Sequence, residues 1–529
     1  MKKRVIVLSG PSCAGKTTVA SLLSEKLGIE VLDTASMLSS AQTDETGLKS
    51  QDSLEQSSID PLDPKWLGET LNQKLRSGNS SETLLVDAVS VPEQVPYLRR
   101  SGWNVIHVHL DAEDDARRER CAIVASVKQA LFGNAEGPQR QLKQIADVVI
   151  DTARCRAEDI VVRLVARVQD RPILSVPVID ILVGGQYGSE GKGNIAHYLA
   201  PEYDVLVRVG GPNAGHTVFR SGQAPYTFRQ LPSGALGNKD AKLVIGAGAV
   251  INLKILLKEI GELSIDFDKL LIDERAMIIE QSDIDWEKEH LEQAIGSTAQ
   301  GTGHATARKI MHRTPTSDVK LAGAVDDLKR YVGDTVEYFA DCLSSQKRIM
   351  LEGTQGTSLS IHHGHYPHVT SRATTAAACL AEAGLPGRHV RRVVMVCRSY
   401  PIRVGDTASG NTSGFMSQTL EFEEIARRSG IDLAEILRTE KGSVSGRQRR
   451  IAEFDWTQIR RSSMLNGPTD IALTFADYFG IENRSAYRYE QLNEPTLRFI
   501  EELERVVGVS VSLISTDFSE RNIIDRRAW

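Results

Sequence analysis

The stretch Gly184-Gly185-Gln186-Tyr187-Gly188-Ser189-Glu190-Gly191-Lys192-Gly193 follows an apolar run at residues 178–183 and precedes a segment with a helical pattern. A glycine-rich turn between a strand and a helix presents backbone N–H groups to an anion, and the ammonium group of Lys192 adds a positive charge. A strand that leads through such a turn into a helix is typical of a parallel α/β sheet. The stretch therefore predicts an α/β fold with a polyphosphate-binding loop.

A second phosphate-binding loop is predicted near the N-terminus. Gly10-Pro11-Ser12-Cys13-Ala14-Gly15-Lys16-Thr17 satisfies the pattern G-x-x-x-x-G-K-[ST] between an expected strand at residues 5–8 and an expected helix at residues 18–27. In this motif backbone amides wrap the phosphates, the lysine neutralises charge, and the hydroxyl of Thr17 can bind Mg²⁺. The predicted phosphate-binding residues of this region are Gly10, Cys13, Ala14, Gly15, Lys16, Thr17, Thr18, Asp33, Asp87, Arg117 and Arg120.

The chain is long enough for two domains, because 529 residues exceed what one hydrophobic core usually serves. Residues 83–87 and 105–111 are predicted to be further buried strands of a parallel sheet. A polar, proline-marked junction within residues 165–177 predicts domains at 1–172 and 177–529. Residues 38–82 are rich in Ser, Gln, Asp and Glu, so a mobile flap or a poorly ordered insertion is predicted there.

The composition is that of an ordinary globular protein, with 41% hydrophobic and 25% charged residues. A net charge of −6 provides no overall basic field, so no nucleic-acid partner is expected. No run approaches the roughly 20 apolar residues that cross a bilayer. The six cysteines lack zinc-ligand spacing and the arrangement of a disulfide framework. These features predict a cytoplasmic protein without a membrane segment.

The loop at residues 184–193, together with Gly211-Pro212-Asn213-Ala214-Gly215-His216-Thr217-Val218, resembles the signature of adenylosuccinate synthetases. The resemblance runs through further blocks in the same order, from Val178 to about Asp525. It implies an α/β domain with a large, mainly parallel central sheet, and a ligase activity. In that family a nucleoside triphosphate phosphorylates the 6-oxygen of a purine nucleotide, and the amino group of L-aspartate then displaces the phosphate.

The resemblance also implies the roles of particular residues. Ser189, His216 and Lys192 would be catalytic, and Ser189 and Gly215 would bind Mg²⁺. The triphosphate donor would contact Gly188, Ser189, Glu190, Gly191, Lys192, Gly193, Gly215, His216, Thr217, Asp477 and Ser515. The purine nucleotide and aspartate would contact Asn213, Ser297, Thr298, Arg313, Gln355, Thr370, Val404, Arg447 and Arg449. The family is a homodimer in which an arginine crosses the interface, so Arg313, or the neighbouring His312, would serve the partner subunit.

Residues 1 to about 170 resemble small kinases of the dephospho-CoA kinase and nucleoside monophosphate kinase type, through the phosphate loop, the strand ending at Asp87 and the pair Arg117 and Arg120. The two arginines are three residues apart on one face of an expected helix, where they could surround a transferred phosphoryl group or simply be solvated. These kinases commonly carry an arginine where this chain has Ser90. Active phosphotransfer and a retained nucleotide-binding or oligomerisation module therefore both stay open.

Three positions depart from the synthetase pattern. Ser189 stands where the family has a catalytic aspartate, and a hydroxyl is a poor base at neutral pH. Serine is expected there in a phage branch of the family that makes diaminopurine DNA precursors from dGMP, because a hydroxyl leaves room for the 2-amino group of guanine. Phe475 and Asp517 replace a lysine and a glycine of the family's guanine pocket, so ATP or dATP becomes an alternative to GTP as energy donor.

The predicted function is the ligation of L-aspartate to C6 of a purine deoxynucleotide, with dGMP favoured over IMP. A conventional adenylosuccinate synthetase that uses IMP and GTP is one alternative, and a nucleotide-sensing pseudoenzyme is another. The sensor is disfavoured because polar groups persist in separate blocks, at His216, Lys192, Gln355, Thr370 and Arg447. The attached kinase-like domain fits the dGMP hypothesis, since a purine-analogue monophosphate must be phosphorylated before a polymerase can use it.

Overall fold

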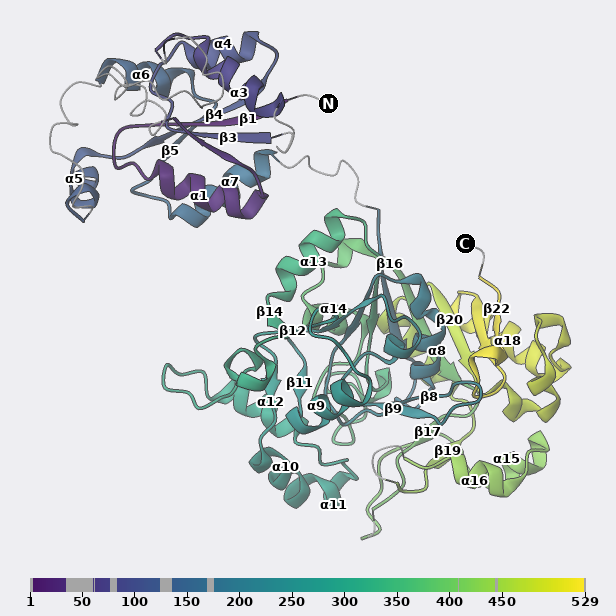
Figure 1. Ribbon diagram of the computed structural model, residues 1–529. Coiled ribbons are helices and arrows are strands. Elements are labelled where there is room, and N and C mark those ends of the chain that lie inside the picture. Colours follow the sequence, from purple (N-terminus) through teal and green to yellow (C-terminus); the bar gives the residue numbers. More distant parts are fainter. Residues whose placement is uncertain are drawn as a thin grey trace. The chain divides into compact units, whose positions relative to one another are not determined.

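The computed structural model describes residues 3–34, 60, 62–76, 83–123, 136–168, 176–407, 409–442 and 446–527. The chain forms two compact units, Met1–Ile173 and Leu174–Trp529, each with its own sheet (Figure 1). The hypotheses that concern residues 38–59, 77–82, 169–175 and 443–445 fall outside the described residues.

The first unit is built on a five-stranded parallel sheet with the order β2-β3-β1-β4-β5. Its strands are β1 (Arg4–Ser9), β2 (Val31–Asp33), β3 (Thr83–Asp87), β4 (Asn104–Asp111) and β5 (Val148–Asp151). One face is covered by α1 (Lys16–Leu27) and α7 (Ala157–Val168), and the other by α3 (Trp66–Arg76), α4 (Gln94–Arg100) and α6 (Glu136–Ile145) (Figure 1). Helix α5 (Asp114–Ile123) follows β4.

Alternation along β1 explains why both faces of this sheet are covered. Ile6 and Leu8 pack with α1 and α7, whereas Val5 and Val7 pack with α3 and α4. All four of these side chains are completely buried, as a parallel strand between two helical layers requires. The predicted α/β fold of this unit is confirmed.

The prediction of a mobile flap is wrong for the end of the polar segment. Residues 66–76 form α3, a helix whose Trp66, Leu67 and Leu71 are buried against the sheet. These apolar residues lie at helical spacing within a polar segment, so the average composition hid an amphipathic helix.

The second unit contains a 10-stranded sheet with the order β14-β12-β10-β7-β15-β6-β16-β20-β21-β22. All neighbours are parallel except β21 and β22, which confirms the predicted large, mainly parallel sheet. Its strands are β6 (Ile179–Gly184), β7 (Val205–Arg208), β10 (Lys242–Ile245), β12 (Leu270–Asp273), β14 (Val332–Gly333), β15 (Ile349–Glu352), β16 (Val390–Arg398), β20 (Asp470–Thr474), β21 (Val511–Ser515) and β22 (Ile523–Asp525).

Helices cover both faces of this sheet (Figure 1). One face packs on α8 (Lys192–Leu199) and α9 (Leu253–Glu262), and the other on α13 (Thr335–Ser344), α14 (Ala376–Ala383), α17 (Trp456–Asn466) and α18 (Glu494–Val507). Strand β6 lies in the middle, with Ile181 and Val183 facing one helical layer and Leu182 facing the other. In such sheets ligands bind beyond the carboxyl ends of the strands.

Smaller elements stand beyond those strand ends. They are the hairpin β8 (His216–Val218) and β9 (Tyr226–Phe228), the helices α10 (Gln281–Glu287), α12 (Thr302–Met311), α15 (Phe422–Ser429) and α16 (Leu433–Thr439), and the antiparallel strands β17 (Ile402–Arg403), β18 (Thr419–Leu420) and β19 (Arg450–Ala452).

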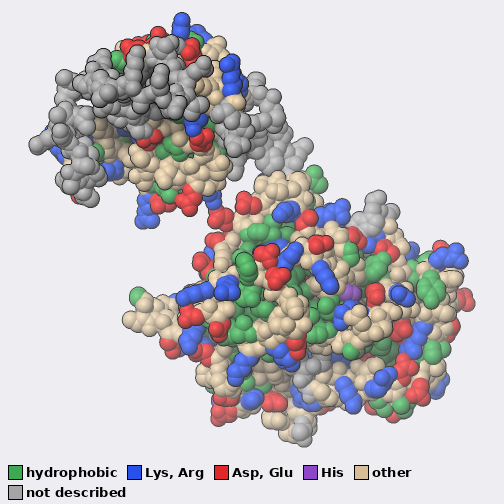
Figure 2. All heavy atoms as spheres, viewed as in Figure 1, with side chains coloured by type: hydrophobic (Ala, Val, Ile, Leu, Met, Phe, Trp, Pro, Cys, Tyr) green, Lys and Arg blue, Asp and Glu red, His purple; other side chains and the backbone are tan. Residues whose placement is uncertain are grey.

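The visible surface carries charges of both signs. Figure 2 shows Lys and Arg side chains interspersed with Asp and Glu side chains over one face of the second unit, with hydrophobic side chains gathered in its middle. Within the described ranges, no helix has both the length and the apolar character needed to cross a membrane.

Candidate active site

Two cavities meet at the loop that follows β6. The first is lined by the predicted purine-nucleotide residues Asn213, Ser297, Thr298, Gln355, Thr370 and Val404. The second is lined by the predicted triphosphate residues Gly191, Lys192, Gly193, His216, Thr217, Asp477 and Ser515. Both cavities share the walls Gly188, Ser189, Gly215, Gly442 and Arg449. The arrangement places Ser189 where groups bound in the two cavities would meet.

The loop around Ser189 is held by its own polar groups. Glu190 accepts hydrogen bonds from the backbone N–H groups of Gln186 (3.0 Å) and Gly188 (2.7 Å). The Lys192 ammonium, which is buried at the start of α8, donates to Glu190 Oε2 (2.8 Å) and to the carbonyl of Gly188 (3.1 Å). Gly188 has φ 96°, and a Cβ there would lie 2.8 Å from the Cα of Gln355, so only glycine fits.

A buried ion pair supports His216. Arg208 and Glu352 end the adjacent strands β7 and β15 in direct register, and their side chains pair at 3.1 Å. Glu352 Oε1 also accepts a hydrogen bond from His216 Nδ1. His216 Nε2 is buried and has no hydrogen-bond partner among the described residues. Because His216 lines the second cavity, this nitrogen remains available to a bound donor nucleotide.

The same cluster sets the protonation of both side chains. Burial, assisted by the charge of Arg208, lowers the pKa of His216 to about 4. Burial alone would raise the pKa of Glu352, but Arg208 and His216 outweigh it and lower the pKa to about 2. Glu352 is therefore a carboxylate at neutral pH, and it holds the proton of the neutral imidazole at Nδ1.

A chain of amide and hydroxyl groups lines the first cavity. Gln355 Nε2 donates to Asn213 Oδ1 (2.9 Å), and Asn213 Nδ2 donates to Thr370 Oγ1 (3.4 Å). The other end of the Gln355 amide accepts from Thr354 Oγ1 (2.9 Å) and from Arg372 Nη1 (3.3 Å). Gln355 has the unusual φ of 57°, which turns its side chain out of the strand direction. The network orients three predicted nucleotide contacts.

The predicted arginines lie in different surroundings. Arg449 lines both cavities and pairs with Glu440 at 3.1 Å. Arg447 lines neither of the two cavities and donates to the carbonyl of Gly296 (3.0 Å), in the loop that contains Ser297 and Thr298. Arg313 is exposed and also lines neither cavity. The structure of one chain therefore gathers Arg449, but not Arg313 or Arg447, into the described cavity walls.

Aromatic rings form one end of the second cavity. Phe219 and Phe518 have ring centroids 4.6 Å apart, and Phe518 meets the edge of Phe475 at 5.7 Å. Beside them Asp477 is buried and pairs with Arg484 at 3.0 Å. Burial nevertheless raises the pKa of Asp477 to about 7. This end of the cavity combines flat apolar surfaces with the carboxyl groups of Asp477 and Asp517, which suits a purine base.

Several lining residues were missed from the sequence. Glu190 was predicted to contact the donor, but it lies behind the loop and lines neither cavity. Tyr187, Glu287 and Arg403 line the first cavity, and Phe219, Lys441 and Phe518 line the second. Tyr187 lies within the quoted loop, and Phe219, Arg403 and Phe518 stand next to residues that the sequence analysis named, whereas Glu287 and Lys441 carried no local signal.

The first unit forms a phosphate loop of the predicted kind. Lys16 Nζ donates to the carbonyls of Gly10 (2.8 Å) and Pro11 (2.9 Å), and burial lowers its pKa, with a smaller effect from the charge of Arg117. Thr17, Asp33 and Asp87 line one surface pocket. These residues bring two carboxyl groups and a hydroxyl to the end of the phosphate loop.

Two other predicted residues of this unit have structural contacts. Arg120 donates to the hydroxyl and the carbonyl of Thr152, both at 2.8 Å, so its guanidinium group already makes hydrogen bonds within the unit. Cys13, in the phosphate loop, is disulfide-bonded, whereas the cysteine spacing predicted no disulfide framework. Spacing along the chain does not report which side chains the fold brings together.

Comparisons with known proteins agree with this division into two units. The family model described as adenylosuccinate synthetase matches residues 181–322 and 316–483, and a model described as an AAA domain matches residues 6–124. The adenylosuccinate synthetases of Methanocaldococcus jannaschii and Pyrococcus horikoshii are 38% and 37% identical over 355 residues, which make up 66% of this chain and 96% and 98% of those proteins.

Solved structures resemble the second unit as well. The structure of cyanophage S-2L succinoaminodeoxyadenylate synthetase, bound to dGMP and to dATP as an energy donor, has 30% identity and a TM-score of 0.56 over 67% of this chain and 96% of its own. The fully ligated adenylosuccinate synthetase from Plasmodium falciparum has 21% identity and a TM-score of 0.58 over 66% of this chain and 100% of its own, which supports the fold alone.

Proposed function

The chain belongs to the adenylosuccinate synthetase family and is a C–N ligase, and from that premise we propose that its second unit joins L-aspartate to C6 of dGMP. The observation that carries the choice of dGMP is Ser189, a hydroxyl at the wall shared by the two cavities, where the family pattern has an aspartate. Guanine differs from hypoxanthine by a 2-amino group next to N1. A short, uncharged side chain leaves space for that group.

The remaining walls support the same assignment. The deoxynucleotide would lie in the first cavity, where the chain of Gln355, Asn213 and Thr370 supplies oriented donors and acceptors. The cyanophage protein bound to dGMP, whose sequence is 30% identical, adds support. Archaeal relatives of higher identity bear the name of the conventional enzyme, so IMP remains the alternative acceptor to be tested.

The reaction expected from the family proceeds in two steps. The γ-phosphoryl group of the donor is transferred to the 6-oxygen of the purine, which gives up its N1 proton to solvent. The aspartate amino group then attacks C6, loses a proton to solvent and releases phosphate. Lys192 would bind the donor phosphates. His216, whose Nδ1 proton is held by Glu352, would take up a second proton at Nε2 when the anionic donor binds and would present it to the transferred group. Arg449, at the shared wall, would bind an aspartate carboxylate through its guanidinium group.

The oxygen atoms at the shared wall fit a Mg²⁺ ion that also binds donor phosphates. Ser189 offers a hydroxyl and Gly215 a carbonyl there, and Mg²⁺ takes few protein ligands when substrate phosphates and water supply the rest. Among the described residues no group of three or more His, Cys, Asp or Glu side chains is placed to hold a metal by itself. When bound, Mg²⁺ would neutralise charge on the transferred phosphoryl group.

The acceptor is tested by mass spectrometry of the products. The purified protein is incubated with Mg²⁺, L-aspartate, ATP or GTP, and either dGMP or IMP. A succinylated dGMP product is expected, and a product from IMP alone would instead establish the conventional reaction. Binding of both nucleotides without any product would contradict the ligase mechanism itself.

The donor is proposed to be ATP or dATP, and Asp477 gives a test. A protonated carboxyl can donate to N1 of adenine and accept from its 6-amino group, whereas a carboxylate only accepts, as the two donors of guanine require. With its pKa raised to about 7, Asp477 loses this proton as the pH rises from 6 to 8. We expect the KM for ATP to rise over this range by up to about tenfold per pH unit above the pKa.

The variant Asp477→Asn should remove that pH dependence, because an amide both donates and accepts at every pH. Its KM for ATP should stay low at pH 8, and its KM for GTP should rise. Steady-state kinetics with each donor at pH 6, 7 and 8 provide the measurement. If the ATP profile of the variant still follows that of the wild type, Asp477 does not read the base.

We also propose that the first unit is an active nucleotide kinase. Lys16, Thr17, Asp33 and Asp87 supply the cation and the oxygen ligands that phosphoryl transfer needs, close to the charge of Arg117. The second unit is proposed to make a nucleoside monophosphate. A nucleoside monophosphate is therefore the class of phosphoryl acceptor that we propose for the first unit.

Replacing Lys16 with alanine separates the two activities. Loss of the ammonium group should lower phosphoryl transfer to deoxynucleoside monophosphates by at least about tenfold. The ligase kcat and KM should stay within about twofold, because the second unit has its own phosphate loop. Both activities are followed by chromatography of the nucleotides. Equal kinase rates in wild type and variant would favour a binding module over a kinase.

A further inference from the structure

One carboxylate, outside all the predicted site residues, joins three segments of the active site. Glu440 follows α16, and its side chain is only 1% exposed. Its Oε1 accepts from Arg398 Nη2 (2.5 Å) and from the Tyr478 hydroxyl (2.7 Å), and its Oε2 accepts from Arg449 Nη1 (3.1 Å). Arg398 ends β16, Tyr478 follows β20, and Arg449 lies just before β19.

The first branch of this cluster leads to the donor end of the second cavity. The Arg398 guanidinium lies over the ring of Phe475, with its central carbon 3.8 Å from the ring centroid. Arg398 Nη1 also approaches the carbonyl of Ser189 at 3.5 Å. Phe475 lines the second cavity. The cation that Glu440 holds therefore touches both the proposed base pocket and the loop between the cavities.

The second branch leads to the wall between the cavities. Arg449 lines both cavities, and its side chain is 18% exposed. Its guanidinium group contacts Glu440 and is also accessible to a ligand in the cavities. The backbone of Glu440 holds the same segment, since its carbonyl accepts from the Arg449 N–H (3.1 Å) and from Gln448 Nε2 (2.8 Å). Residue 440 thus fixes both the backbone and the side chain of Arg449.

The electrostatics favour a positioning role over a purely structural one. Burial would raise the pKa of Glu440, but Arg398 and Arg449 outweigh it and lower the pKa to about 2. A buried carboxylate between two guanidinium groups has a desolvation cost that apolar packing would avoid. The arrangement instead leaves one surplus positive charge at the wall where anionic substrates would meet.

We propose that Glu440 is a positioning residue that orients Arg449 toward L-aspartate and couples it, through Arg398 and Phe475, to the donor-nucleotide cavity. The inference rests on the proposed role of Arg449 in binding aspartate. Donor bound against Phe475 would fix Arg398, and Arg398 and Arg449 share the one carboxylate. Affinity for aspartate then depends on Glu440, although Glu440 does not touch the substrate.

The test compares Glu440→Gln and Glu440→Asp with the wild type, using whichever of dGMP or IMP yields a succinylated product. In Glu440→Gln the KM for L-aspartate should rise about tenfold, in the range usual for coupled sites. The KM for the purine monophosphate should stay within about twofold, because the first cavity has its own network. Glu440→Asp keeps the charge and should give a smaller rise. Glu440→Asp also tests the positioning role of Glu440 if Glu440→Gln does not fold.

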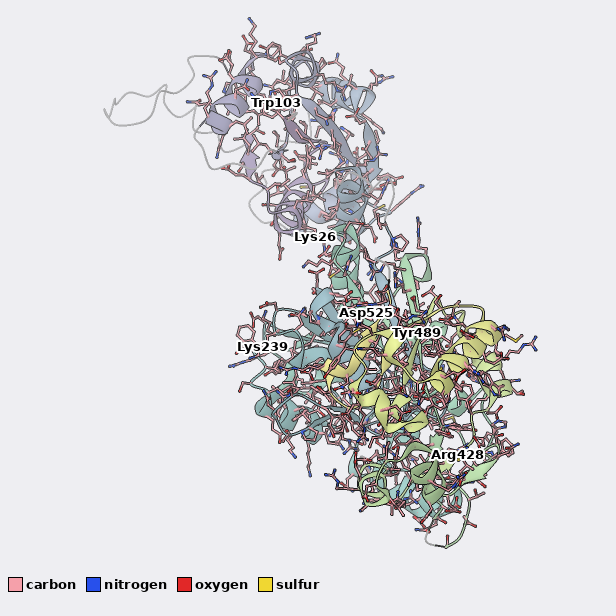
Figure 3. The ribbon with its side chains drawn as sticks, turned by 90° about the vertical axis from the view of Figure 1, so that its right-hand side faces the viewer. Lys26, Trp103, Lys239, Arg428, Tyr489 and Asp525 are labelled. Carbon is pink, nitrogen blue, oxygen red and sulfur yellow. The ribbon has the colours of Figure 1, made fainter. Side chains whose placement is uncertain are left out.

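The matched control is Glu453→Gln. Glu453 pairs with Arg428 at 2.7 Å and is partly exposed, and Figure 3 shows Arg428 near the lower end of the second unit. This variant also removes a carboxylate from an arginine, but it should leave all KM values unchanged. In an Arg449→Lys background, Glu440→Gln should raise the aspartate KM little further.

Equal rises in the KM of every substrate, or an unchanged aspartate KM in both Glu440 variants, would overturn the positioning role. Failure of the wild type to form any succinylated product would instead overturn the proposed function, so the two failures are distinguishable.

Discussion

Replacing Ser189 with aspartate should convert the acceptor preference from dGMP to IMP. The change introduces a carboxylate at the wall shared by the two cavities, where it can take the N1 proton of hypoxanthine. General-base catalysis contributes roughly 10²–10⁴-fold, so the ratio of kcat/KM for IMP over dGMP should rise by at least about 100-fold. The same carboxylate would crowd the 2-amino group of guanine. Competition of the two nucleotides in one reaction, read by mass spectrometry, measures the ratio directly.

The variant Ser189→Asn is the control for this prediction, because asparagine has the size of aspartate without its charge or basicity. It should lose activity on dGMP through crowding and gain none on IMP. A Ser189→Asp enzyme that keeps its preference for dGMP would show that position 189 does not select the acceptor. The side-chain amides of Gln355 and Asn213 would then be the groups expected to select it.

The two phosphate loops could be predicted from the sequence because each has the order strand, glycine-rich turn and helix. Helices α1 (Lys16–Leu27) and α8 (Lys192–Leu199) begin at the lysines of these loops. The parallel sheets followed from the same order, repeated along the chain. Helix α3 (Trp66–Arg76) was not predicted, since Trp66, Leu67 and Leu71 lie in a segment whose average composition is polar.

The candidate site was predicted where motifs are local and missed where the fold joins distant residues. His216 stands in a recognisable block, but the carboxylate that holds it is Glu352, 136 residues away, and only the register of β7 and β15 places that carboxylate beside Arg208. Glu440 and its partner Arg398 are 42 residues apart and belong to no motif. Pairings of this kind require the sheet order, which spacing in the sequence does not contain.

Replacing His216 with asparagine should lower the ligase kcat by roughly 10²–10³-fold, the range found when a preorganised donor to a transition-state oxygen is removed. Asparagine can keep a hydrogen bond to Glu352 but places nothing at the position of Nε2, the buried nitrogen that lines the donor cavity without a partner among the described residues. The KM values should change little, since Lys192 and the loop amides still bind the phosphates.

Single-turnover assays with saturating donor, acceptor and aspartate separate this effect on chemistry from binding. The variant Glu352→Gln distinguishes the role of the supporting carboxylate, because it keeps the His216 ring in place while removing the charge that holds the Nδ1 proton. Its kcat should fall less than that of His216→Asn. If the asparagine variant turned over at the wild-type rate, the catalytic proton would have to come from another group that lines the donor cavity, such as the ammonium group of Lys192.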